Sequence, residues 1–288
     1  MTGRLSEVDE RIGSVRQLKA VITAMRGIAA ARAQEAKAHL AGIRAYAETV
    51  GGAIGEALAL MPDVDGRMAG ETAAGRRLVI ALSSEQGFVG TFNERVLDAA
   101  GRHLKGAGEA ELFLVGDRGL MAAAERELNV AWSAPMAAHV EEAQGLANRL
   151  ADAVLKRLSA GVTAVTVVHA VPADGGGAFA LVDRSLVPLD FERFPVASRA
   201  IPPLVTQDPG TLIAQLADEY LFAELSEAIM LSFAAENEAR MRAMIAARHN
   251  VDERLDDLTG LYRRLRQDEI TDEIIELASG ADAGAGSR

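Results

Sequence analysis

The sequence has no cysteine among its 288 residues. Disulfides, thiol catalysis and cysteine-ligated metal sites are therefore excluded, and the composition is compatible with a reducing compartment. Aromatic residues make up only 4% of the chain, although 49% of it is hydrophobic. Much of the apolar content is alanine, a strong helix former of small volume. This composition favours long helices in close contact over a thick aromatic core.

Long apolar runs and an excess of basic residues are also missing. No run approaches the roughly eighteen apolar residues of a membrane-spanning helix. The N-terminus starts in a charged amphipathic pattern, so we expect no secretory signal. The formal net charge of -11 argues against a nucleic-acid binder. We expect most of these charges to lie on a solvated acidic surface.

The sequence lacks the motifs of common catalytic and nucleotide sites. Its five histidines show no HxH or HExxH spacing, so we expect no metal site. GxGxxG and GxxxxGK[ST] motifs are absent. Gly87 and Gly90 fall in the first strand-to-helix loop, where a phosphate cradle would lie, but no basic residue follows until Arg95, so a tight turn is favoured. No histidine base lies near Ser83 and Ser84 in sequence. We expect no cofactor and no catalytic site.

Proline and glycine are nearly absent from Thr211–Gly280, whose one interior glycine is Gly260. A continuous helix of this length would be a rod of roughly 100 Å. In its distal half the apolar residues recur in steps of four and three, which is typical of a coiled-coil seam. The residues of this seam are Val251, Leu255, Leu258, Tyr262 and Leu265.

A second seam lies at the other end of the chain, in Leu5–Leu60. Its steps alternate strictly between three and four residues. It consists of Leu5, Val8, Ile12, Val15, Leu18 and Ile22, and continues through Met25 and Ala29. Since each seam needs a partner, we expect the two stretches to pair as an antiparallel coiled coil. The alanines that follow, from Ala29 to Ala38, would give this coil a smooth outer surface.

The middle of the chain alternates short branched runs with amphipathic ones, which predicts a Rossmann-like, largely parallel, three-layer α/β domain. A glycine-rich hairpin is expected around Ala173–Gly177. The expected strands are Leu78–Leu82, Glu111–Val115, Asn129–Trp132, Val162–Ala170 and Phe179–Leu189, and the expected helices are Phe92–Leu104, Gly119–Leu128 and Val140–Leu158.

These patterns predict a composite α+β architecture. Residues 1–60 and 211–288 form a discontinuous coiled-coil shaft, and residues 77–190 form an inserted α/β foot domain. Residues 61–76 and 191–210 are linkers, the second of them rich in proline. The small, polar tail Ala281–Arg288 is expected to be disordered.

Three regions of the chain closely resemble the gamma subunit of F-type ATP synthases. The C-terminal stretch Ile270–Ala283 follows the family pattern I-T-x-E-x-x-E-x-x-x-G-A-x-A, preceded by Arg266–Gln267. Upstream, the segment from Ser232 to Met244 follows S-x-x-x-E-x-x-x-R-M-x-A-M. The N-terminal segment Arg11–Arg32 resembles R-I-x-S-V…A-M-K-x-V-A-A-A-K, and Ser84–Asn93 resembles S-D-x-G-L-x-G-x-F-N.

The resemblance implies a non-catalytic rotor subunit at the centre of a rotary motor. Its partners would be the α and β subunits, the epsilon subunit and the c-ring, on the cytoplasmic face of a bacterial plasma membrane. Ion flow through the ring would turn the shaft, which then drives the catalytic sites of the α/β hexamer. Contacts with the β-subunit catch loops are implied for Met25, Arg26, Arg240, Gln267 and Thr271.

Some positions depart from the family pattern, which is typical of a divergent paralogue. Gln17–Leu18 replaces an Asn-Thr pair, and Ala20–Thr23 replaces a Lys-Ile-Thr-Lys run, so that cations are lost near the implied catch. The alternative reading is a coiled-coil scaffold or regulatory protein outside the ATP synthase. A stand-alone α/β enzyme with a helical arm is disfavoured by the missing site chemistry.

Overall fold

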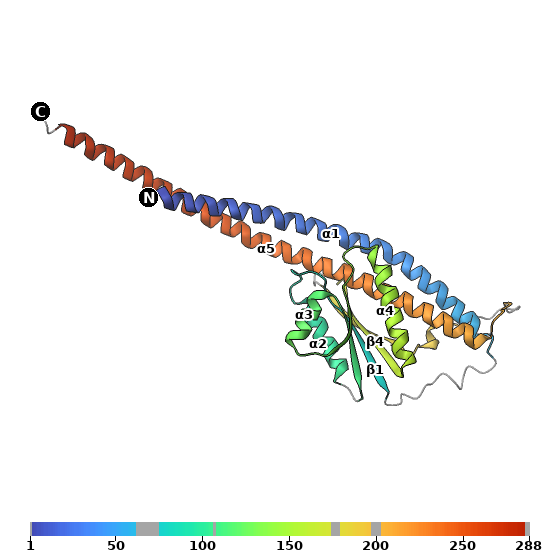
Figure 1. The fold of residues 1–288 in the computed structure, drawn as a ribbon. Helices are drawn as coiled ribbons and strands as arrows, with labels where there is room; N and C mark the ends of the chain where they lie inside the picture. Colours follow the sequence, from blue (N-terminus) through green and yellow to red (C-terminus); the bar gives the residue numbers. More distant parts are fainter. Residues whose placement is uncertain (1, 62–74, 106–107, 174–178, 197–202, 286–288) are drawn as a thin grey trace. The chain divides into compact units, whose positions relative to one another are not determined.

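The computed structural model describes residues 2–61, 75–105, 108–173, 179–196 and 203–285 (Figure 1). Its contacts divide the chain into a coiled-coil unit, Met1–Ile28 with Met241–Arg288, and an α/β unit, Ala29–Arg240. Both long helices, α1 (Thr2–Leu58) and α5 (Pro209–Ala285), contribute to both units. This division cuts the two helices, whereas the predicted boundaries follow the linkers at residues 61–76 and 191–210.

The coiled-coil unit is held by the two predicted seams. Val8, Ile12 and Leu258 are buried together, and four half-buried side chains pack around them: Val15, Leu255, Tyr262 and Leu265. The Lys19 Nζ atom lies 2.5 Å from Asp252 Oδ1, which fixes the antiparallel register on the flank of the seam. The paired seams confirm that the two ends of the chain form one antiparallel coiled coil.

The seam prediction fails at Leu18, which leaves 49% of its surface exposed. At this level of the coil the neighbouring Lys19 reaches Asp252 on the opposite helix. One turn further on, Ile22 is buried again, so the seam resumes after this interruption. Leu5 and Val251, at the two ends of the predicted seams, are half-buried.

The start of α5 follows the expected capping chemistry. Pro209 occupies the first helical position, where its missing N–H costs no hydrogen bond. The Asp208 carboxylate accepts a hydrogen bond from the Thr211 backbone N–H at 3.1 Å.

At its other end α5 continues to Ala285, so the prediction of disorder is wrong for residues 281–285. Alternating alanines in this stretch favour the helix. Residues 286–288, the rest of the predicted tail, lie outside the described residues.

The α/β unit contains one five-stranded sheet in the order β3-β2-β1-β4-β5. The first four strands are parallel, and β5 pairs antiparallel with β4, which confirms the largely parallel sheet and its terminal hairpin. The predicted hairpin loop falls mostly on residues 174–178, outside the described residues. The strands are β1 (Arg76–Leu82), β2 (Ala110–Val115), β3 (Val130–Ala134), β4 (Val162–Val171) and β5 (Ala180–Val187).

Helices cover both faces of this sheet. The helices between the strands are α2 (Phe92–Leu104), α3 (Asp117–Glu125) and α4 (Glu142–Ser159), and the 3-10 turn η1 (Phe191–Arg193) follows β5. On one face Ile80 packs with Leu146 of α4 and Ile229 of α5. On the other, Val79 packs with Phe92 and Leu97 of α2. Because successive side chains of β1 point to opposite faces, this strand contributes to the hydrophobic core on each side of the sheet.

The alanine run of α1 forms the expected outer surface only in part, at the exposed Ala31 and Ala38. Ala29, Ala33 and Ala36 are buried, and Ala36 belongs to the sheet-facing core of the α/β unit. Small side chains at these positions let the helix backbone approach its neighbours closely.

A chain of ion pairs links the sheet to both long helices within the α/β unit. Arg184 of β5 lies 2.7 Å from Glu224 and 3.3 Å from Glu227 of α5, and Arg44 of α1 lies 2.7 Å from Glu227. Burial alone would raise the pKa of Glu227, but Arg44 and Arg184 outweigh it and lower that pKa. Glu224 is only 4% exposed, so Arg184 is essential to its charge balance.

Shortening a seam residue should open the coiled coil locally. We expect Ile12→Ala to destabilise the coiled-coil unit by about 2 kcal/mol, because Ile12 is buried and a cavity remains. Hydrogen exchange of residues 5–20 and 250–265 would measure the loss. Leu18→Ala is the matched control and should change exchange little. Equal effects of the two variants would contradict the observed seam.

Removing Arg184 should destabilise the α/β unit more than removing Arg44. Arg184→Met leaves Glu224 buried without its closest cation, a loss of about 3 kcal/mol or more. Arg44→Met removes a half-exposed partner of Glu227 and should cost about 1 kcal/mol or less. Urea unfolding followed by tryptophan fluorescence would compare them, since Trp132 lies in this unit. A larger loss in Arg44→Met would refute this ranking.

Candidate partner-contact site

Four of the five implied contact residues lie in the coiled-coil unit, in two groups. Met25 and Arg26 are adjacent and half-buried on α1, and Gln267 and Thr271 are exposed one turn apart on α5. The Thr271 hydroxyl donates to the backbone carbonyl of Gln267 at 2.8 Å.

The two groups lie apart along the coil. Because Lys19 pairs with Asp252, Met25 lies level with Ala246 in the antiparallel register. Gln267 is about 21 residues further along α5, a separation of about 30 Å. The groups therefore cannot contact one partner loop together, and each would need a separate one.

The group on α5 belongs to a longer exposed stripe. Gln267, Ile270, Thr271 and Ile274 stand at positions i, i+3, i+4 and i+7 and so share one helix face. Ile270 is 47% and Ile274 60% exposed. The first turn of α1 still lies beside this part of α5, because Arg4 and Leu5 line one groove with Leu265 and Thr271. Within the coiled-coil unit α5 then runs on past the start of α1 (Figure 1). The projecting stripe combines apolar and polar groups in the way that partner-binding surfaces do.

Arg240, the fifth implied residue, lies inside the α/β unit and is only 4% exposed. Its guanidinium donates to the backbone carbonyls of Gln86 and Gly87, at 3.0 and 3.2 Å, and to Glu236 at 2.5 Å. These bonds occupy the planar fork that a partner carboxylate would need. The geometry gives Arg240 an internal binding role in the chain described here.

Glu236 is part of the family pattern from Ser232 to Met244, but the sequence reasoning gave it no role. It stands one turn before Arg240 and is 3% exposed, so it supplies from the same helix the carboxylate that Arg240 was expected to find on a partner. The four-residue spacing on a helix was the available signal.

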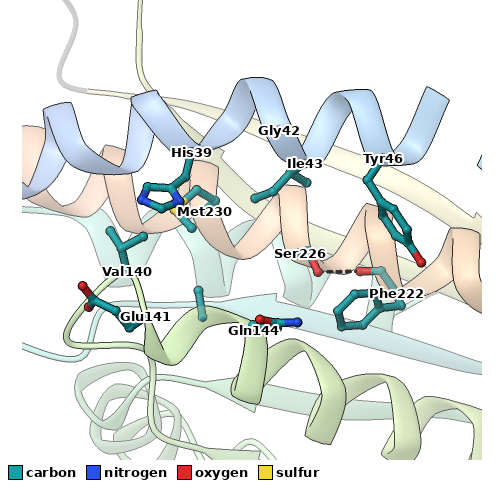
Figure 2. A pocket seen from close by; sticks show the side chains of 11 residues that line it. His39, Gly42, Ile43, Tyr46, Val140, Glu141, Gln144, Phe222, Ser226 and Met230 are labelled. Atoms are coloured by element: carbon teal, nitrogen blue, oxygen red, sulfur yellow. Dashed lines mark hydrogen bonds between the residues drawn. The ribbon is translucent and has the colours of Figure 1, made fainter. Parts of the chain in front are cut away.

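A cavity of about 490 Å³ lies between α1, α4 and α5 in the α/β unit (Figure 2). Its walls include Ile43 and Tyr46 of α1, Gln144 of α4, and Phe222 and Met230 of α5. The volume is within the range of small-molecule sites. The only hydroxyl groups on its lining are already engaged: that of Ser226 donates to the Phe222 carbonyl at 2.7 Å, and that of Tyr46 to Glu219 at 2.6 Å. The Glu219 carboxylate raises the pKa of Tyr46 to about 12. The lining therefore offers no activated nucleophile.

Among the residues that the structure describes, no group of three or more histidine, aspartate or glutamate side chains is arranged to hold a metal ion. No described helix combines the length and the apolar character needed to cross a membrane.

Sequence comparisons give the family of this chain. The model of the family described as ATP synthase matches residues 4–283. An ATP synthase gamma chain of Frankia casuarinae is 31% identical, over 98% of this chain and 98% of its own length. An ATP synthase gamma chain of Acidiphilium cryptum is 29% identical, over 97% of this chain and 99% of its own length.

Structural comparison agrees with the sequence. A chain of the Euglena gracilis mitochondrial ATP synthase, in a structure of its OSCP, F1 and c-ring, matches 98% of this chain with a TM-score of 0.65 at 12% identity, over 95% of its own length. A chain of the central stalk and c-ring of Tetrahymena thermophila mitochondrial ATP synthase covers 79% of this chain and 99% of its own, with a TM-score of 0.55 at 17% identity. The shared fold, the family match across nearly the whole chain and the two similar gamma chains lead to one conclusion: this chain belongs to the ATP synthase family, as a gamma chain.

Proposed function

We propose that this chain is the central-stalk rotor of an F-type ATP synthase and that it couples through the projecting stripe of α5. The observation that carries this proposal is the exposure of the stripe from Gln267 to Ile274, which begins beside the first turns of α1 and continues along α5 beyond them. A gamma chain holds no catalytic site; it acts as a subunit of the rotary complex. Its surface therefore has to transmit force to the subunits that hold nucleotide.

The partners that we propose are the α and β subunits around the coiled coil, with the c-ring and epsilon subunit at the α/β unit. Similar chains occur in assemblies titled OSCP/F1/c-ring and central stalk/c-ring, which supports this set. Met25 and Arg26 would meet one partner loop, and Gln267 and Thr271 a second loop about 30 Å away. Arg240 would support coupling from within the α/β unit.

We also propose that the chain works on the cytoplasmic face of a bacterial plasma membrane, held there by its partners. The similarity to gamma chains of Frankia casuarinae and Acidiphilium cryptum supports this location.

Gene replacement separates the rotor from a scaffold outside the ATP synthase. A host lacking its own gamma chain would receive this gene, and membrane vesicles would be assayed for ion-driven ATP synthesis. We expect assembly together with synthesis. Stable assembly without synthesis would favour the scaffold reading instead.

A single substitution in the stripe should reduce ion-driven ATP synthesis without disassembling the complex. We expect Gln267→Ala to lower ion-driven ATP synthesis several-fold while the amount of assembled complex stays unchanged, because Gln267 is exposed and supports no packing within the chain. Arg254→Ala, exposed on the same helix but outside the stripe, is the matched control and should leave both quantities unchanged. Parallel losses of synthesis and assembly in Gln267→Ala would assign the residue to assembly alone.

A further inference from the structure

The carboxyl end of β1 is the place where an open α/β sheet usually binds a ligand. The chain proceeds from β1 to β2 and β3 on one side, whereas β4 lies on the other side of β1. This reversal creates a topological switch point between β1 and β4, and ligands bind in the crevice beyond the strand ends at such points. Backbone N–H groups of the loop after β1 commonly hold the anionic part of that ligand.

In this chain the loop after β1 already holds an anion, the carboxylate of Glu236 from α5. The backbone N–H groups of Glu85 and Gln86 donate to its two oxygens, each at 3.4 Å. The Ser232 hydroxyl, one turn earlier on α5, donates to the Leu82 carbonyl at the end of β1 at 3.3 Å. Thus α5 lies directly over the end of the strand and inserts its carboxylate into the loop.

Arg240 completes the arrangement by binding both the carboxylate and the loop. Its Nη2 atom donates to Glu236 and to the Gln86 carbonyl, while Nε donates to the Gly87 carbonyl. Burial raises the pKa of the Glu236 carboxyl, whereas Arg240 and the two loop N–H groups oppose that shift. The groups directed at its oxygens are donors, which suits an ionised carboxylate that only accepts hydrogen bonds.

The loop itself adopts a conformation that needs external support. Phe88 has a φ of 61° and Gly90 a φ of 60°. A positive φ is unfavourable for a bulky residue such as phenylalanine. The Phe88 side chain is 67% exposed, so its own packing does little to offset this strain. The bonds that Glu236 and Arg240 make to Glu85, Gln86 and Gly87 lie immediately before it.

We propose that the Glu236 carboxylate is a built-in anion that occupies the anion-binding loop at the switch point and positions residues 85–90. The helix α5 takes the place that a ligand phosphate holds in other α/β proteins. When the Glu236 side chain is removed, the same loop N–H groups form a binding site for a small carboxylate anion, with Arg240 as its counter-ion. The bonds of Glu236 also tie the sheet to the helix that carries force, a role that rests on the proposed function.

Removing the internal carboxylate and supplying an external one tests this proposal. Hydrogen exchange of residues 84–90 would be measured on the full-length chain, wild type and Glu236→Ala, in 100 mM sodium formate and in 100 mM sodium chloride. In chloride, we expect exchange in this segment to be at least tenfold faster in Glu236→Ala than in wild type. Formate should reverse at least half of that acceleration and leave the wild type unchanged.

Further variants keep the test decisive. Glu236→Gln preserves the shape of the side chain but removes its charge, so we expect faster exchange of the loop. Formate should not reverse this effect, because the amide still fills the site. This variant also replaces Glu236→Ala if Glu236→Ala does not fold. Glu238→Ala, on the same helix and paired with Lys37, is the control and should leave residues 84–90 unchanged. Unchanged exchange in Glu236→Ala or Glu236→Gln, or equal effects of formate and chloride on Glu236→Ala, would overturn the proposal. This readout needs no partner subunit, so its failure is distinct from a failure of the proposed function.

Discussion

The register between the two seams is the constraint on which the coiled-coil unit depends. Buried contacts among Val8, Ile12 and Leu258 join segments from opposite ends of the sequence, so neither helix can form its apolar interface alone. The loop-closure entropy of the whole intervening chain opposes this pairing. The folded α/β unit between the two segments lowers this entropy cost, because it shortens the flexible loop that pairing has to close.

In the α/β unit, buried ion pairs fix how α5 is placed on the sheet. Arg184 joins β5 to α5, and the pair of Glu236 and Arg240 joins α5 to the loop after β1. A buried ion is tolerated only with nearly complete partners, so each of these links permits one arrangement of helix and sheet. Apolar packing on both sheet faces supplies the bulk of the stability, and the ion pairs fix where α5 lies along the strands. For a gamma chain, a fixed position of this helix on the sheet is what allows force to pass between them.

Much of the fold follows from periodicity in the sequence. The alternating three- and four-residue steps identified Val8, Ile12 and Leu258, and short apolar runs predicted the five strands, because both signals are local. Leu18 shows the limit of this reasoning, since the ion pair of Lys19 with Asp252 depends on a residue far along the chain. Arg240 was expected to contact a partner subunit, whereas within this chain its guanidinium binds a carboxylate of its own helix. The four-residue spacing of Glu236 and Arg240 indicates that they can pair, but the burial of that face of α5 depends on tertiary packing that no local pattern reports.

The absence of cysteine allows a direct test of the central claim, that the two ends of this chain pair with each other. Cysteines would be placed at Ile12 and Leu258, which share one buried cluster, and the double variant would be oxidised at low protein concentration. If the two ends pair, a disulfide forms within one chain, and none forms when the second cysteine is placed at the exposed Ile245 instead. Cross-links only between different chains, or equal yields from both variants, would contradict it.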